Sequence, residues 1–166
     1  MSQAEKEDID VLFATGWETA YPVFNMKNPA HKMYFVQDFE PLFYGMGSKA
    51  VLAENTYRFG FYGITAGCWL TKKVGEYGMK ADFFDFGADL DIYRPTEKTP
   101  KKKQICFYAR PVTERRAFEI GVLTLTKFHQ MHPDYNIVFF GWDVSDYDIP
   151  FPYENRGIIS PAELSS

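Results

Sequence analysis

Short apolar runs alternate with amphipathic stretches along most of this chain, and the alternation predicts its architecture. The runs that predict strands are residues 10–15, 33–37, 63–66, 81–86, 104–109, 136–140 and 156–159. The stretches that predict helices are residues 18–24, 48–59, 69–77 and 113–132. Strands that alternate with helices are typical of βαβ units, so we predict an α/β fold with mostly parallel sheets.

Several positions predict where these helices begin and end. Ser48 and Thr113 are suitable N-cap residues, and Gly78 is a suitable helix stop. The longest predicted helix has apolar residues spaced by three or four: Phe118, Val122, Leu125, Phe128 and Met131. Residues 160–163, Ser-Pro-Ala-Glu, form a capping box that predicts a last helix. Because the sequence stops three residues later, we expect that the rest of this helix, and of the protein, is missing from the chain.

Residues 95–103 interrupt the alternation and predict a division into two cores. This stretch is polar, contains proline and lysine, and has no periodicity. Such composition is typical of a linker between two units, here residues 1–94 and 104–166. The three consecutive lysines at its end are better explained by a solvated linker than by a phosphate-binding patch.

Composition and charge exclude several functional classes. Hydrophobic residues make up 46% of the 166 positions, which argues against global disorder. The net charge of −4 gives no electrostatic case for nucleic acid. The two cysteines, Cys68 and Cys106, have neither metal-site nor disulfide spacing, and a reducing, cytoplasmic compartment fits them best. The polar N-terminus is no signal peptide, and peripheral membrane contact stays open.

The sharpest local chemistry follows the strand at 104–109. Arg110 ends that strand, and Arg115 and Arg116 fall in the first predicted turn of the next helix. Ligands of parallel sheets collect at the carboxyl ends of the strands, and a helix N-terminus with arginines suits a diphosphate. The alternative is that Arg115 and Arg116 are solvated or paired with neighbouring glutamates.

Candidates in the first half lie beyond two other strand ends. Trp17 could stack on a sugar, and Asp38 and Glu40 could bind an acceptor hydroxyl or form an acid/base pair. The structural alternative for the two carboxylates, capping the turn before Pro41, is somewhat favoured. No histidine or carboxylate set supports a metal site, and the common hydrolase, NTPase and dehydrogenase motifs are absent from the sequence.

Several longer stretches resemble a known family. They are YFVQDFEPLFY (34–44), ADFFDFGADLDIYRP (81–95), ICFYARPVTERRAFEIGVLTL (105–125) and NIVFFGWDVSDYDIPFPYENRGIISPAEL (136–164). They are similar to the rhamnan-synthesis (rhamnosyltransferase) branch of the retaining family-4 glycosyltransferases, over nearly the whole chain from about Asp8 onward. The resemblance implies the GT-B architecture, two Rossmann-like domains. Residues 1–94 would be the later part of the acceptor-side domain, and residues 104–166 the first part of the donor-binding domain.

The resemblance also implies site residues and substrates. Arg110 matches the arginine that contacts the donor diphosphate, and Arg115 matches a second basic position, whereas Arg116 departs from a glycine. Residues Gly157, Ile158, Ile159 and Ser160 match the loop that holds the nucleobase. The donor would be a nucleotide sugar such as dTDP-L-rhamnose, the acceptor a glycan, and neither metal nor further cofactor would be needed. The catalytic residues stay unassigned.

The chain also departs from that family. The glycine-rich first turn, a downstream basic residue and a glutamate pair seven residues apart are not in this sequence. We therefore expect a glycosyltransferase fragment that acts with a complementing chain, placed in the cytoplasm or peripherally at the inner membrane face. The alternative is a non-catalytic remnant or interaction module that kept part of a nucleotide-sugar pocket and self-associates.

Overall fold

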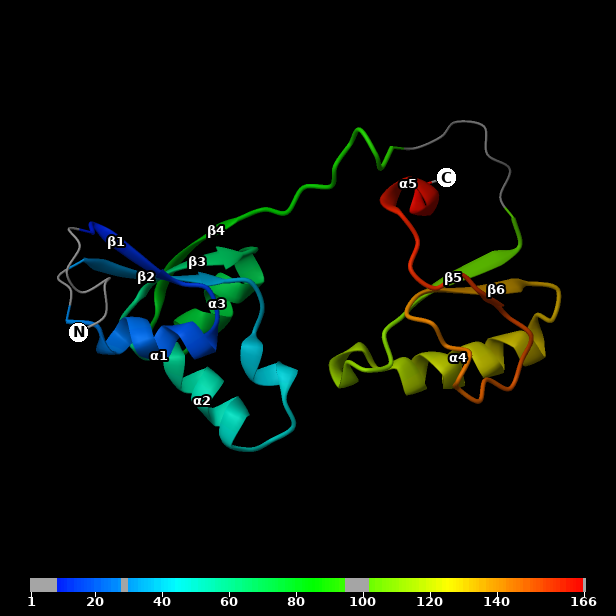
Figure 1. The fold of residues 1–166 in the computed structure, drawn as a ribbon, viewed down its shortest axis with the longest axis horizontal. Helices are drawn as coiled ribbons and strands as arrows, with labels where there is room; N and C mark the ends of the chain where they lie inside the picture. Colours follow the sequence, from blue (N-terminus) through cyan, green and yellow to red (C-terminus); the bar gives the residue numbers. More distant parts are fainter. Residues whose placement is uncertain (1–8, 28–29, 95–101, 166) are drawn as a thin grey trace. The chain divides into compact units, whose positions relative to one another are not determined.

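The computed structural model describes residues 9–27, 30–94 and 102–165, and the chain folds into two compact units, divided between Gly87 and Ala88 (Figure 1). Each unit is an α/β fold with a parallel sheet, which confirms the predicted fold class. Of the predicted linker, only residues 102 and 103 are among those described.

Unit 1, residues 9–87 as described, contains a four-stranded sheet and three α-helices. In chain order its elements are β1 (Val11–Ala14), α1 (Trp17–Asn25), β2 (His31–Val36), η2 (Glu40–Phe43), α2 (Ser48–Thr56), β3 (Tyr62–Ala66), α3 (Cys68–Gly75) and β4 (Lys80–Phe84). The strand order in the sheet is β1-β2-β3-β4, with every pair parallel. Strand order thus follows chain order, and each crossover passes through a helical segment.

The helices of unit 1 cover one face of its sheet. Right-handed crossovers between strands in sequential order place all their helices on the same side. In Figure 1 the helices α1 and α2 lie below the strands. One buried cluster joins the inward positions of the strands, such as Ala14 and Tyr34, to Val23 of α1 and Val74 of α3.

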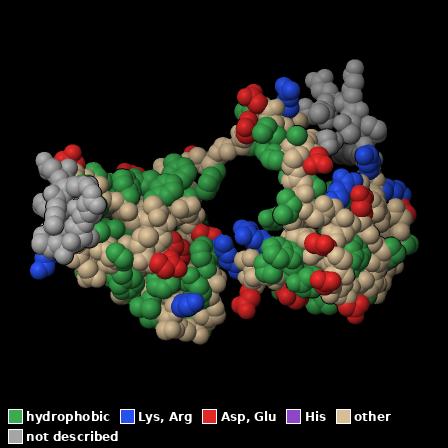
Figure 2. Space-filling model, in the orientation of Figure 1, with side chains coloured by type: hydrophobic (Ala, Val, Ile, Leu, Met, Phe, Trp, Pro, Cys, Tyr) green, Lys and Arg blue, Asp and Glu red, His purple; other side chains and the backbone are tan. Residues whose placement is uncertain are grey.

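The opposite face of this sheet, which we call the helix-free face, carries large apolar side chains. Strand alternation places Val11, Phe13, Phe35, Tyr62, Ile64 and Phe84 on it. Phe13 is 49% exposed, and the Phe35 and Phe84 rings stack with centroids 5.5 Å apart. Figure 2 shows hydrophobic side chains gathered along the upper side of unit 1, where the strands run.

Unit 2 contains a three-stranded parallel sheet packed on one long helix. Its elements are β5 (Gln104–Ala109), η3 (Glu114–Arg116), α4 (Phe118–Met131), β6 (Asn136–Gly141), β7 (Glu154–Asn155) and α5 (Pro161–Leu164), with strand order β5-β6-β7. Phe118 and Leu125 of α4 are buried against Ile137 and Phe139 of β6. Helix and sheet approach closely at Gly121, where a Cβ would lie 2.3 Å from Phe107 Cζ.

Most of the predicted elements occur, but residues 156–159 form no strand and some of the predicted ends were wrong. The N-cap of α2 is Gly47, so Ser48 is already helical. The last strand comes earlier than residues 156–159 and covers only Glu154–Asn155. Met131, expected on the apolar side of α4, is 59% exposed. The capping box at the chain end is confirmed, because Ser160 Oγ accepts the Glu163 N–H at 3.2 Å and Glu163 Oε2 accepts the Ser160 N–H at 2.8 Å.

The start of α4 is the largest correction. The helix begins at Phe118, not Thr113, and Arg115 and Arg116 lie in the 3-10 turn η3 before it. Between the two, Ala117 has a left-handed backbone with φ of +51°. That conformation costs a non-glycine residue about 1–2 kcal/mol. It is offset by the burial of Phe118, since a buried phenylalanine contributes about 1.5–3 kcal/mol.

Candidate functional site

A cavity of about 420 Å³ lies at the carboxyl edge of the unit 2 sheet. The strands β5 and β6 end side by side there, with Ala109 paired to Gly141. The parallel register brings the residues after both strands to one place. The lining residues are Tyr108, Ala109, Arg110, Phe140, Gly141, Trp142, Ile158, Ile159 and Leu164.

Glycine at position 141 allows this edge to form. Its φ is +104°, which L side chains rarely adopt, and a Cβ there would lie 2.5 Å from the Tyr108 ring and 2.8 Å from the Ala109 oxygen. The Gly141 N–H donates to the Gly157 oxygen at 2.7 Å, and the Trp142 N–H donates to the Ala109 oxygen at 3.0 Å. The backbone therefore turns sharply under Tyr108, and the Gly141–Gly157 bond ties the end of β6 to the segment that carries Ile158 and Ile159.

A second set of bonds around Asp143 holds the loop after β6. Asp143 Oδ1 accepts the Ser145 N–H at 2.9 Å, the Asn155 side-chain amide at 2.6 Å and the Ser145 hydroxyl. These hydrogen bonds, first that from the Ser145 hydroxyl, lower the pKa of the Asp143 carboxyl. Asn155 in turn accepts the Gly157 N–H at 3.3 Å. Asp143 thus stays ionised and orders one wall of the cavity from outside it.

Two groups of predicted residues meet in this cavity. Arg110, predicted to bind a diphosphate, and Ile158 and Ile159, predicted beside the nucleobase, are all lining residues. Arg110 is exposed, and within residues 9–27, 30–94 and 102–165 its guanidinium group has no hydrogen bond or ion pair. A single unpaired cation therefore stands at the rim of an aromatic and aliphatic cavity.

The other predicted donor-side residues lie outside the lining. Gly157 supplies the backbone bond to Gly141, and Ser160 caps α5. Arg115 and Arg116 are exposed in η3, so the expected placement in the first turn of α4 was wrong. A cation at an α-helix N-terminus is unfavourable, and the observed turn avoids it.

Sequence reasoning missed the aromatic wall of the cavity. Tyr108 and Phe140 are paired across β5 and β6 with ring centroids 5.4 Å apart, and Trp142 is 46% exposed beside them. Alternation along a strand places residues i and i+2 on one face, so Tyr108 could have been assigned to the side of Arg110. The contribution of Leu164 from α5 has no comparable signal in the sequence.

At the carboxyl edge of the unit 1 sheet, one of the predicted residues, Glu40, is a buried carboxylate, and another, Trp17, is bonded to it. Glu40 is 5% exposed, and its Oε2 accepts the Trp17 N–H at 2.7 Å and the Tyr34 hydroxyl at 3.2 Å. The Glu40 N–H donates to the Tyr57 hydroxyl at 3.1 Å. Trp17 is the first residue of α1, so the carboxylate satisfies one of the free N–H groups of a helix start.

The titration of this cluster follows from its burial. Burial raises the pKa of the Glu40 carboxyl, against the lowering effect of the bonds from Trp17 and Tyr34, and the charges of Glu18 and Asp38 raise it further. Burial likewise raises the pKa of Tyr34 and of Tyr57, so both phenols stay protonated; the Tyr34 hydroxyl donates to Glu40, and the Tyr57 hydroxyl accepts from the Glu40 N–H. Asp38 Oδ1 accepts the Phe39 N–H at 2.8 Å.

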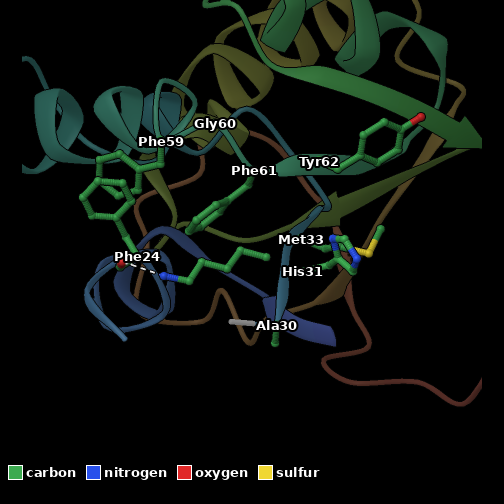
Figure 3. Close-up of a pocket in the computed structure, with 9 residues that line it drawn as sticks. Phe24, Ala30, His31, Met33, Phe59, Gly60, Phe61 and Tyr62 are labelled. Atoms are coloured by element: carbon green, nitrogen blue, oxygen red, sulfur yellow. Dashed lines mark hydrogen bonds between the residues drawn. The ribbon is translucent and has the colours of Figure 1, made fainter. Parts of the chain in front are cut away.

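A second cavity of about 690 Å³ lies at the opposite edge of the unit 1 sheet, where β2 and β3 begin. Figure 3 shows Phe24 and Phe59 on one side of it and His31 and Met33 on the other. Lys32 Nζ donates to the Phe24 and Met26 oxygens at 2.8 and 2.7 Å and so caps α1. This second cavity is lined by none of the predicted site residues. Ligands of parallel sheets gather at the carboxyl edge, which is the opposite edge of the sheet.

The described residues include no group of three or more side chains suited to hold a metal ion. Among these same residues, no helix is long and apolar enough to cross a membrane.

Comparison with known proteins agrees with the resemblance seen in the sequence. Residues 3–66 match a family model described as "WsaF, N-terminal domain". Over 161 residues the chain is 35% identical to "O-antigen biosynthesis protein RfbC" of Myxococcus xanthus. That alignment takes 93% of this chain and 12% of the relative, so the chain spans a small part of the protein that it matches.

Proposed function

We propose that this chain is part of a retaining, GT-B-type glycosyltransferase of polysaccharide biosynthesis, which transfers a sugar such as L-rhamnose from a nucleoside diphosphate to a glycan acceptor. The observation that carries the proposal is the unpaired Arg110 at the rim of a cavity whose other predicted residues are Ile158 and Ile159. The family match over residues 3–66 and the similarity to an O-antigen biosynthesis protein support the same activity.

The lining suits the nucleotide part of such a donor. An aromatic base and a sugar ring fit a cavity walled by Tyr108, Phe140 and Trp142. The Arg110 guanidinium can bind two oxygens of a diphosphate at once, and it offsets the charge that gathers on the diphosphate as the sugar leaves. Ser160 and Gly157 hold the segment with Ile158 and Ile159 in place, while Arg115 and Arg116 remain candidates for a contact with the diphosphate.

The acceptor would bind unit 1, where Trp17, Asp38 and Glu40 are the candidates. We place the reaction in a reducing compartment, the cytoplasm, because both cysteines are free and exposed. Peripheral membrane contact and a complementing chain belong to the same proposal, since the relative is much longer than the region matched.

Calorimetric titration with dTDP and UDP tests the donor site. Replacing Arg110 by alanine should weaken nucleoside diphosphate binding by about 1–3 kcal/mol, the scale of a lost hydrogen bond to a charged group. Arg58→Ala is the matched control, because Arg58 lies in unit 1 and pairs with Glu54. Arg115→Ala and Arg116→Ala should have smaller effects, because neither lines the cavity. Equal affinity of wild type and Arg110→Ala would count against the donor site.

A further inference from the structure

The two oxygens of the Glu40 carboxylate have different surroundings. Oε2 is bound by the Trp17 N–H and the Tyr34 hydroxyl. Oε1 has no hydrogen-bond donor among residues 9–27, 30–94 and 102–165. A carboxylate that is 95% buried normally has partners for both oxygens, since an unpaired buried charge is costly.

Oε1 nevertheless reaches solvent. In the described part of the chain, His129 Nδ1 is the sole fully buried side-chain nitrogen or oxygen that lacks a hydrogen bond. Glu40 Oε1 also lacks one, so it must retain some accessible surface. The oxygen can therefore still accept a hydrogen bond from outside the protein.

Gly16 lies close to this oxygen. A Cβ on Gly16 would be 3.9 Å from Glu40 Oε1 and 3.5 Å from Glu18 Oε2. The φ of Gly16 is −171°, which is extended backbone that any residue adopts. The backbone conformation does not require glycine here, and a Cβ would meet no clash. Glycine leaves unoccupied the position that this Cβ would take, above Oε1.

An oriented aromatic side chain borders the same turn. Trp17 follows Gly16 and is partly exposed, and its Nε1–H donates to the Tyr44 hydroxyl at 3.0 Å. The Tyr44 hydroxyl donates to Glu18 Oε1 at 3.3 Å. The Trp17 and Tyr44 rings meet edge to face at 6.0 Å, so the orientation of the indole is set by the protein. The amphipathic faces of sugars pack on aromatic rings, and their hydroxyls need acceptors.

We propose that Glu40 Oε1 accepts a hydrogen bond from a hydroxyl of a pyranose unit that enters beside Gly16, next to the Trp17 ring. The inference rests on the proposed function and deepens it, because it assigns the acceptor glycan to the turn between β1 and α1. A neutral hydroxyl suits this position, since Glu18 and Asp38 already surround Glu40 with negative charge. Oε2 holds the start of α1 while Oε1 holds the ligand.

Saturation-transfer NMR on the full chain tests this site with defined probes. The probes are the methyl glycosides of α-L-rhamnose, α-D-mannose, β-D-galactose and β-D-glucose. At least one should bind the wild type, and Gly16→Ala should weaken that binding about tenfold or more by filling the space above Oε1. Glu40→Gln should weaken it to a similar extent, on the scale of a hydrogen bond to a charged group. Gly87→Ala is the control, because a Cβ there meets nothing within 4 Å.

The outcomes separate this inference from the donor site. Glycoside binding that Gly16→Ala abolishes, with an unchanged unfolding temperature, supports the inference even if Glu40→Gln folds poorly. Absence of binding to the wild type, or equal binding by Gly16→Ala, overturns it. Neither variant should alter dTDP or UDP binding, whereas Arg110→Ala should alter it. A normal glycoside response without any Arg110 effect would reject the donor proposal alone.

Discussion

The two units differ in the residues that lie at the carboxyl edges of their parallel sheets. These residues carry opposite charges and are held by different hydrogen bonds. Unit 1 gathers its strand ends on a buried carboxylate, and the Glu40 contacts join residues up to 23 positions apart. Unit 2 relies on glycine backbone at Gly141 and leaves a cation, Arg110, at its rim without a partner among the described residues. The residues that follow the strands therefore decide the chemistry at the edge of a parallel sheet. In unit 1 they form a hydrogen-bond acceptor, and in unit 2 they form a candidate anion site.

The largest expected effect concerns the glycine-based edge of unit 2. Gly141→Ala should destabilise that unit by about 2–6 kcal/mol, because the left-handed φ costs about 1–3 kcal/mol and the overlap with Tyr108 costs a similar amount. Hydrogen exchange should show faster exchange in β5 and β6 and unchanged protection in β1–β4. Unchanged protection in β5 and β6 would contradict this account of the edge.

A second pair of variants compares helix–sheet distances in the two units. Gly121→Ala in α4 should destabilise unit 2 by about 1–3 kcal/mol, since its Cβ would overlap the Phe107 ring. Gly75→Ala, at the end of α3 with nothing within 4 Å, should be neutral or stabilise unit 1 by up to about 1 kcal/mol. Denaturant unfolding followed separately in each unit measures both changes. Only Gly121→Ala is expected to destabilise its unit, and equal effects of the two variants would show that the contact at Phe107 is unimportant.

The buried carboxylate of unit 1 predicts a particular pH dependence. The folded pKa of Glu40 is raised, so its proton is bound more tightly in the folded than in the unfolded state. The contribution of Glu40 to the free energy of unfolding is therefore full below the pKa of the unfolded state and is lost as pH rises through the pKa of the folded state. Each unit of difference between the two pKa values corresponds to about 1.4 kcal/mol. The stability difference between wild type and Glu40→Gln, measured from pH 4 to 8, should fall over that window. A constant difference would argue against the burial effect.

The smallest effect on stability is expected at the exposed Asp143 cluster of unit 2. Its dependence on pH is opposite in sign to that of Glu40. The folded pKa of Asp143 is lowered by the bonds from Ser145 and Asn155, so its stabilisation is present above the unfolded pKa and lost as pH falls through the folded value. Thermal unfolding of Asp143→Asn should show a lower melting temperature than wild type at neutral pH and a smaller gap in acid. A gap that widens in acid would reject this role.

The sequence predicts the alternating elements and the parallel sheets because strand and helix periodicity are local properties. It also predicts Arg110 at this edge, since positions after parallel strands converge there, whereas Ile158 and Ile159 were expected beside the donor from the family resemblance alone. The start of α4 was wrong because the burial of Phe118, a tertiary effect, outweighs the local preference for a helix from Thr113. The pairing of Glu40 with Trp17 joins residues 23 positions apart, and no local pattern reveals such a bond.

The sequential strand order of unit 1 has a consequence for handling the protein in solution. Since α1, α2 and α3 share one side of the sheet, the rings of Phe13, Phe35, Tyr62 and Phe84 remain on a side without helices. A properly folded sample should then bind hydrophobic dyes such as ANS, a response usually taken as a sign of a molten globule. Near-UV circular dichroism, which reports fixed aromatic packing, is therefore the sounder criterion of folding for this chain.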